Sequence, residues 1–248
     1  MTTVPFPIVG PTYSNRALPV SNQQTRNFYV EVNPQGAELL SLMPFPGLKL
    51  FTTAGTGPNR GATAYDGKLY VVTGPSLYSV DSDQVVTNIG SIDGEARCSF
   101  AVSITSGGST LSIATGVGKP YTWDGTTFTQ GTDVDLASSN TVQYLNRRVI
   151  YDGSGSDIIF AGLDTPLSVN SLNVASTDTK SDNTIAGLAY QQQYFAFCEE
   201  SIEPWYQTGV SNPPYSLVVN GVKNIGLSAV HSVAKNKAHA YFLGSDRM

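Results

Sequence analysis

The sequence predicts an all-β protein: a β-propeller-like series of repeats, each of four antiparallel strands, with an extended N-terminal arm and an incomplete last repeat. Two observations lead to this fold class. The first is composition: 13% of the 248 residues are charged, against about 25% in typical globular proteins, whereas Gly numbers 24, Pro 14, Tyr 13 and Phe 10. This disfavours helices and favours strands joined by tight turns. The second is a strand–turn–strand pattern whose starts lie 39 to 45 residues apart, close to the roughly 40–50 residues of a propeller blade.

Each repeat begins with two strands rich in Tyr, Phe, Val and Ile around a polar turn. Asp66-Gly67 in the first repeat and Gly107-Gly108 in the second favour the positive φ angles that a two-residue hairpin turn needs. The expected hairpins span residues 62–72, 101–114, 141–151, 186–197 and 229–243.

A second hairpin completes most repeats, starting with a strand that carries a bulky aromatic residue. These strands are expected at residues 76–81, 119–125, 157–163 and 201–209. Both faces of such sheets carry apolar side chains, so neighbouring repeats must pack against each other. The fifth repeat stops after its first hairpin, which predicts about four and a half repeats that continue in a longer parent chain. A sandwich or an irregular barrel with similar strand spacing stays open as the competing architecture.

Residues 1–60 differ from the repeats and are predicted to form an N-terminal arm and lead-in strand before a propeller-like domain at 61–248. The arm is rich in proline and shows little alternation, apart from a short strand expected near 27–32. A Pro-Phe-Pro-Gly turn at 44–47 and a further strand are expected to lead into the first repeat. An arm of this kind typically binds a neighbouring molecule or latches a ring.

Charge and hydropathy narrow the function classes. The formal net charge of −5 argues against a surface whose main task is to grip phosphates by charge. The apolar runs are only a handful of residues long, so the sequence predicts no membrane insertion by this chain.

A set of collinear motifs resembles a known family. The N-terminal motifs are Asn-Phe-Tyr-Val-Glu-Val-Asn-Pro at 27–34 and Phe-Pro-Gly-Leu at 45–48, followed by Arg60-Gly61. The C-terminal ones are QQQYFAFCEESIEPWYQTG at 191–209 and IGLSAVHSVAKNKAHAYFLGSD at 225–246. Together they resemble the packaged-DNA stabilisation proteins of short-tailed phages, also called tail accessory factors or tail nozzle (tail hub) proteins.

The resemblance implies a structural protein of the virion tail, made in the host cytoplasm, and no enzyme. It implies a homo-oligomeric ring, usually of about six copies, beneath the head-to-tail adaptor protein, with tailspike or tail needle proteins as further partners. Such a ring extends the DNA channel, touches genomic DNA only transiently and non-specifically, and helps to retain and eject the genome. No cofactor, metal or catalytic residue is expected.

Two groups of residues are candidate partner contacts. The arm contributes Asn27, Phe28, Tyr29 and Pro46, which belong to the motifs above. Turns of the third and fifth hairpins contribute basic residues at comparable positions, and these would lie on one rim of a ring. They are Arg147, Arg148, Lys235 and Lys237.

The alternative function is a carbohydrate-binding or glycoside-hydrolase-like β-propeller. It predicts that Trp123, Trp205, Glu199 and Glu203 converge on one pocket, where the rings stack on sugars and the carboxyls act as acid and base. A scaffold propeller that binds proteins outside a virion is a third possibility.

Other potentially reactive residues are expected to have structural roles. Asp66, Asp124 and Asp152 each precede Gly and are interpreted as turn residues. His231 and His239 lack the neighbouring ligands of a metal site and are expected to be packed or surface residues on adjacent strands. The remaining pair, Cys98 and Cys198, is expected to stay as buried free thiols.

Overall fold

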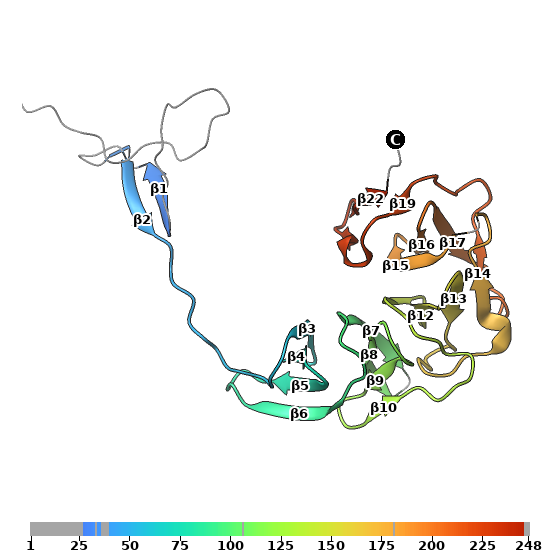
Figure 1. Ribbon diagram of the computed structural model, residues 1–248, viewed down its shortest axis with the longest axis horizontal. Coiled ribbons are helices and arrows are strands. Elements are labelled where there is room, and N and C mark those ends of the chain that lie inside the picture. The colour runs from blue at the N-terminus through green and yellow to red at the C-terminus, as the bar shows by residue number, and fades with distance from the viewer. Residues whose placement is uncertain (1–26, 33, 36–39, 106, 181, 246–248) are drawn as a thin grey trace, which may run out of the picture. The chain divides into compact units, whose positions relative to one another are not determined.

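The computed structural model describes residues 27–32, 34–35, 40–105, 107–180 and 182–245 (Figure 1). The chain divides into two compact units, residues 1–51 and 52–248. The arm expected over residues 1–26 lies outside the described residues, and the expected division at residue 60 stays a prediction.

The described residues of the first unit form an antiparallel hairpin. Strand β1 (Phe28–Val32) pairs with β2 (Leu40–Pro44), with Phe28 opposite Pro44. The strand expected near residues 27–32 is therefore confirmed. The turn at 44–47 and the strand expected after it are wrong, because residues 45–58 contain no strand. Pro46 has no N–H for a strand ladder, which agrees with the end of β2 at Pro44.

The second unit contains four four-stranded antiparallel sheets, here called blades 1 to 4, and a C-terminal segment. In each blade the strands are hydrogen-bonded in chain order, which excludes the sandwich and confirms the propeller-like fold. Blade 1 has β3 (Asn59–Tyr65), β4 (Lys68–Thr73), β5 (Ser76–Val80) and β6 (Val86–Ser91). Blade 2 has β7 (Ser99–Thr105), β8 (Gly108–Ala114), β9 (Tyr121–Trp123) and β10 (Phe128–Gln130). Blade 3 has β11 (Val142–Leu145), β12 (Arg148–Asp152), β13 (Asp157–Phe160) and, after the 3-10 turn η1 (Ser171–Asn173), β14 (Val174–Ser176). Blade 4 has β15 (Thr184–Tyr190), β16 (Gln193–Cys198), β17 (Ile202–Gln207) and β18 (Tyr215–Leu217).

The fifth hairpin expected from the sequence is wrong in its extent, as the C-terminal segment shows. In place of long strands over 229–243, it has the 3-10 turn η2 (Val230–Ser232) and two pairs of two-residue strands. Ser232 closes the turn, because its N–H and Oγ–H both donate to the Ala229 carbonyl, at 3.1 and 2.8 Å. The pairs are β20 (Ala234–Lys235) with β21 (Ala240–Tyr241), and β19 (Gly226–Leu227) with β22 (Gly244–Ser245).

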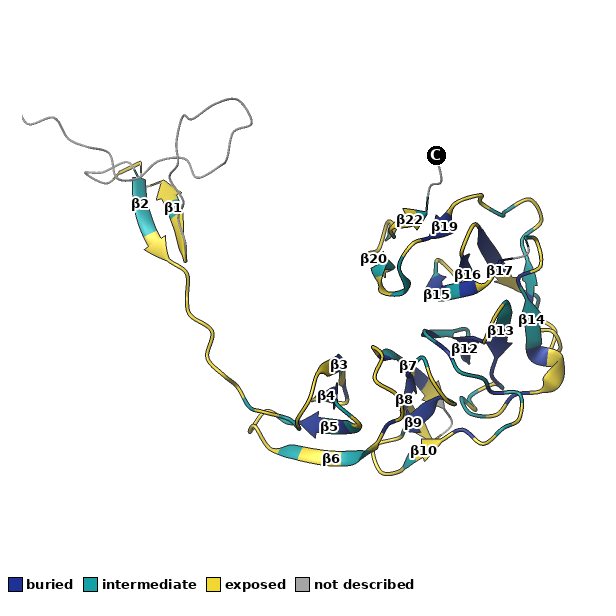
Figure 2. Ribbon diagram, in the orientation of Figure 1, coloured by how far each residue is buried: buried dark blue, intermediate teal, exposed yellow. Residues whose placement is uncertain are grey.

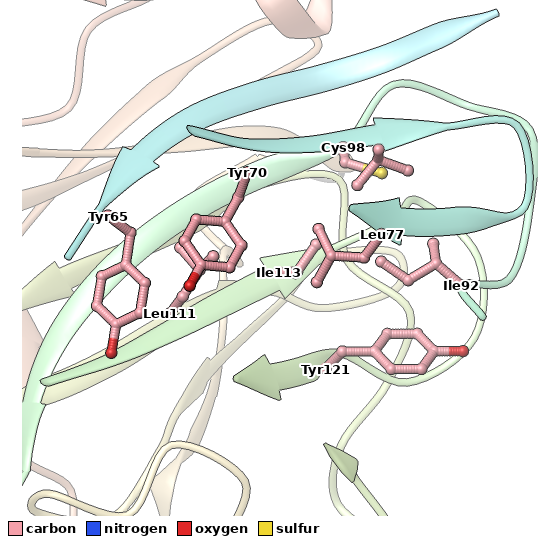
Figure 3. Close-up of a cluster of buried hydrophobic side chains, with 9 residues drawn as sticks. Tyr65, Tyr70, Leu77, Ile92, Cys98, Leu111, Ile113 and Tyr121 are labelled. Atoms are coloured by element: carbon pink, nitrogen blue, oxygen red, sulfur yellow. The ribbon is translucent and has the colours of Figure 1, made fainter. Parts of the chain in front are cut away.

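The core consists of apolar clusters between neighbouring blades. Figure 2 shows that buried residues gather on middle strands of the blades such as β5, β8 and β12, whereas the first strand β3 and the outer strands β6 and β10 are largely exposed or intermediate. The cluster between blades 1 and 2 includes Tyr65, Tyr70 and Leu77 from one side and Leu111 and Ile113 from the other (Figure 3). Similar clusters join blade 2 to blade 3, blade 3 to blade 4, and blade 4 to the C-terminal segment.

Tyrosine hydroxyls connect the blades close to their first turns. Tyr65 of blade 1 donates to the Ser109 carbonyl of blade 2 at 2.6 Å, and Tyr215 of blade 4 donates to the Leu145 carbonyl of blade 3 at 3.1 Å. Each ring thus buries apolar surface between blades while its hydroxyl satisfies a backbone acceptor of the next blade. Tyr residues in this sequence therefore contribute to both packing and register.

Arg60, at the start of β3, binds the connection between blades 1 and 2, which is residues 92–98. Its side chain is buried, and its guanidinium donates to the carbonyls of Ala96 and Asp93, both at 2.7 Å, and of Gly74 at 3.1 Å and Ile92 at 3.5 Å. The fork of five N–H donors suits this role, because a lysine has only three donors at one point.

The interpretation of Asp152 as a turn residue is wrong, whereas the same interpretation of two other aspartates is confirmed. Asp66 and Asp124 are turn residues as expected, since Asp66 has a φ of 47° and Asp124 Oδ1 accepts from the N–H groups of Thr126 and Thr127. Asp152 instead ends β12, is fully buried, and accepts from the Thr141 N–H at 2.7 Å through Oδ1. Burial raises its pKa well above the usual value, so the fold favours the protonated carboxyl.

We predict that Arg60→Met lowers the free energy of unfolding by about 2–4 kcal/mol, because four carbonyls lose their donor in a buried connection. Chemical denaturation of the purified chain measures this change. Arg97→Met is the matched control: Arg97 is exposed in the same connection, and the expected change is within about 0.5 kcal/mol. Equal effects of the two substitutions would contradict the role given to Arg60.

We predict that Asp152→Asn becomes increasingly favourable to stability as the pH rises from 4 to 7. Asparagine keeps the acceptor for the Thr141 N–H. In the wild type, the unfolded chain ionises Asp152 above about pH 4, whereas the raised pKa makes the folded chain hold the proton to a higher pH, so ionisation favours unfolding as the pH rises. Denaturation curves at pH 4, 5.5 and 7 measure the difference.

The control for that experiment is Asp124→Asn. The Thr127 and Thr126 N–H groups lower the pKa of Asp124, so its ionised form is favoured in the folded state and the substitution should have the opposite sign at pH 7. A stability difference for Asp152→Asn that does not change with pH would show that this carboxyl is ionised in the fold.

Candidate assembly interfaces

The hairpin of the first unit brings together the four candidate contacts of the arm. Asn27 has a φ of 62° directly before β1, and its carbonyl accepts from the Phe45 N–H at 2.9 Å, next to the Phe28–Pro44 pair. Tyr29 contacts Phe45, with ring centroids 5.1 Å apart. Asn27, Phe28, Tyr29 and Pro46 therefore lie at one end of the β1–β2 hairpin.

The segment that follows β2 exposes a run of large apolar side chains. Leu48 and Leu50 are 105% and 77% exposed, and Phe45 and Phe51 are more than half exposed. Sequence reasoning missed these residues as contacts, although the alternation in PFPGLKLF is a visible signal. An isolated two-stranded hairpin is marginally stable in water, and clustered exposed apolar residues mark interaction sites. The hairpin and residues 45–51, here called the arm surface, thus have the properties of a docking surface.

Arg147 lies on an exposed turn of blade 3, as expected. Asn146 and Arg147 both have positive φ, and the Arg147 guanidinium forms an ion pair with Asp164, with Nε 3.2 Å from Oδ1. The hydrogen bond and the opposite charge raise the pKa of Arg147 and lower that of Asp164. Arg147 can meet a partner only by sharing or leaving this carboxylate.

The expectation that Arg148 is an exposed turn residue is wrong, because it is buried at the start of β12. Its Nη1 donates to the Ala161 carbonyl at 2.8 Å, and burial lowers the pKa of the guanidinium. The difference follows from their positions: Arg147 lies in the turn, with a φ of 65°, whereas Arg148 is the first residue of β12, whose residues are all buried.

Lys235 and Lys237 belong to the short β20–β21 hairpin. The Lys235 Nζ donates to the Ala189 carbonyl of blade 4 at 2.6 Å, which ties this hairpin to β15. Lys237 lies in the exposed turn between the two strands. Of the four basic candidates, Arg147 and Lys237 are thus the two whose side chains extend from exposed turns.

The residues of the carbohydrate alternative do not converge. Trp123 packs against the cluster between blades 1 and 2, whereas Trp205 belongs to the cluster between blades 3 and 4. Glu203 is fully buried in β17, and its Oε1 accepts from the Thr179 N–H at 3.1 Å. Glu199 lies in the exposed turn before β17, so the pocket expected for a glycosidase is wrong.

Histidine and cysteine also take structural or surface positions. Cys98 and Cys198 are buried free thiols, as expected, and burial raises the pKa of both. His231 lies in η2 and His239 in the turn after β20, so the expectation that they lie on adjacent strands is wrong.

Within the described ranges, no group of three or more His, Cys, Asp or Glu residues could hold a metal ion. In the same part of the chain, no helix has the length and hydropathy to cross a membrane.

Solved structures give weak likenesses. A structure of BamB from Moraxella catarrhalis is 12% identical with a TM-score of 0.47, covering 74% of this chain and 54% of that chain. A structure described as YCF48 bound to D1 peptide is 14% identical with a TM-score of 0.45, covering 90% and 72%. The chain spans 23% to 56% of the first four solved structures it resembles. At these identities and TM-scores the likenesses carry no argument about function.

Sequence comparison gives a stronger result. No curated protein sequence matches the chain. A family model described as the bacteriophage P22 Gp10 β-propeller matches residues 4–248, which includes all four blades and the arm surface. Since this match spans nearly the whole sequence, the chain belongs to the packaged-DNA stabilisation family of phage structural, virion-associated proteins that includes bacteriophage P22 Gp10.

Proposed function

We propose that this protein is a structural component of a short phage tail. In this proposal it forms a ring of roughly six copies below the head-to-tail adaptor protein, extends the DNA channel and helps to retain and then eject the genome. The observation that carries the proposal is the family match over residues 4–248. The protein acts by assembly and not by catalysis.

The arm surface is the proposed docking element toward the adaptor and neighbouring copies. Its exposed Leu48 and Leu50 supply apolar area, and burying a leucine side chain contributes about 1.5–3 kcal/mol. A single arm of this size binds weakly, but several arms on one ring bind together, so that many small contacts add up to a stable attachment.

The propeller would present its exposed turns, with Arg147 and Lys237, to tailspike or tail needle proteins. The chain has 14 Lys plus Arg against 19 Asp plus Glu, so it carries no net positive charge that would hold a polyanion. A channel wall of this kind touches DNA transiently and non-specifically, which allows ejection to proceed.

We predict about six copies of this chain in each purified, DNA-filled particle, because the proposal places one closed ring of about six copies on the tail axis. Quantitative mass spectrometry against the portal and major capsid proteins measures the copy number. Absence from particles would overturn the tail proposal and leave a scaffold role outside the virion. A copy number in the hundreds would also overturn it, because one tail has a single axial ring.

We predict that Leu48→Asp combined with Leu50→Asp reduces the copies per particle at least about tenfold, since charged side chains cannot be buried at the proposed interface without a large cost. Val134→Asp is the matched control, because Val134 is 89% exposed on the propeller unit. Both variants should melt like the wild type. Unchanged incorporation of the arm variant would contradict docking through the arm surface.

A further inference from the structure

A cavity of about 320 Å³ lies at the inner side of the propeller unit. The first strand of a blade runs along this inner side, as Figure 1 shows for β3, β7 and β15. The cavity is lined by residues of β3, β7, β11 and β15, by the connection before β7, and by η2 of the C-terminal segment. It therefore contacts both ends of the series of blades.

Two basic side chains face this cavity from opposite ends of the series. Arg97 comes from the connection between blades 1 and 2, and His231 comes from η2 after blade 4. Arg97 forms no ion pair or hydrogen bond with any residue that the structure describes. No Asp or Glu is among the described residues that line the cavity. In a chain with a net charge of −5, this leaves a local excess of positive charge without a protein counter-ion.

Polar side chains of the inner strands add hydrogen-bond donors to the same wall. Three of them, Ser99, Thr141 and Gln143, use a side-chain oxygen to accept from a backbone N–H of the following blade. The donor–acceptor pairs are Val142 N to Ser99 Oγ at 3.2 Å, Gly187 N to Thr141 Oγ1 at 2.8 Å, and Ala189 N to Gln143 Oε1 at 3.2 Å. With these acceptors occupied, the Ser99 hydroxyl proton and the Gln143 amide NH₂ are available to donate, whereas the Thr141 hydroxyl also hydrogen-bonds the Asp152 carboxyl.

We propose that this cavity, here called the axial cavity, binds a small oxyanion of the phosphate class between Arg97 and His231, with Ser99 and Gln143 as further donors. The forked guanidinium matches the oxygens of a tetrahedral anion, and charge-assisted hydrogen bonds of this kind are about twice as strong as neutral ones. A volume of about 320 Å³ accommodates a small ion with water and excludes a DNA duplex. The inference does not depend on the proposed tail function.

The anion would act as a bridge between the first and last parts of the propeller unit. Arg97 precedes blade 2 and His231 follows blade 4, so one bound ion joins segments that are far apart in the sequence. A ligand that binds only the folded chain stabilises it by mass action. The melting temperature is therefore a readout of binding.

The pH dependence has a defined sign. Burial and, second, the nearby Arg97 lower the pKa of His231, so the imidazole is neutral at pH 7 and becomes a cation in more acidic solution. The other titratable group on the cavity wall, the Cys98 thiol, has a raised pKa and stays neutral, and β3, β11 and β15 contribute no titratable side chain to it. Anion affinity should rise as the pH falls from 7.5 to 5.5.

The test uses the purified full chain and inorganic phosphate, with chloride at equal ionic strength as the reference. Isothermal titration calorimetry and melting temperature are measured for the wild type, Arg97→Gln and His231→Gln. Sulfate replaces phosphate in the pH series, because sulfate does not itself titrate in this range. Arg147→Gln is the matched control, since Arg147 is an exposed arginine that does not line the axial cavity.

We expect saturable phosphate binding to the wild type and to Arg147→Gln at pH 7, with at least about tenfold lower phosphate affinity for Arg97→Gln. In the sulfate series, we expect His231→Gln to lose at least about tenfold in affinity at pH 5.5. Equal phosphate effects in all four proteins, or no effect in any, would overturn the proposal. Binding of an oligonucleotide that requires Arg97 while phosphate does not bind would also overturn it, in favour of a nucleic-acid contact.

Discussion

Every blade of this protein has apolar side chains on both faces, and that one constraint governs the rest of the structure. In β12, Ile150 packs toward blade 4, whereas its neighbours Val149 and Tyr151 pack toward blade 2. A sheet of this kind cannot be stable alone in water, so each blade needs a neighbour on each side. The connection held by Arg60 and the short C-terminal segment both serve this need, because each places apolar residues against a blade.

The buried polar groups follow from the same packing. Arg60 and Arg148 are both buried, and each binds backbone carbonyls where blades or strands meet. Asp152 lies under the start of blade 3, where burial raises its pKa and its Oδ1 accepts from the Thr141 N–H. Ionisable residues are few in this chain, and these two arginines and one carboxyl support the backbone between sheets. The low charge content thus reflects a fold whose polar contacts are made mainly by hydroxyl, amide and backbone groups.

The two units differ in what they offer to other molecules. The arm surface exposes large apolar side chains such as Leu48 and Leu50, which is typical of a segment that becomes buried on assembly. The propeller unit packs apolar clusters between neighbouring blades, exposes single apolar residues such as Val134, and presents polar turns and a donor-lined axial cavity. Attachment through the arm surface and packed blades in the other unit suit the proposed role in a phage tail.

Local sequence by itself determined the all-β class, the four complete blades, the strand near residues 27–32 and the turns at Asp66 and Asp124, because turn chemistry and alternation act over a few residues. Only the tertiary structure decided that Arg148 and Asp152 are buried, that Trp123 and Trp205 lie apart, and that the fifth hairpin is short. It also brought Arg97 and His231 to one cavity. These outcomes depend on which face of each strand a neighbouring blade covers, and the alternation of a single strand does not say which neighbour that is.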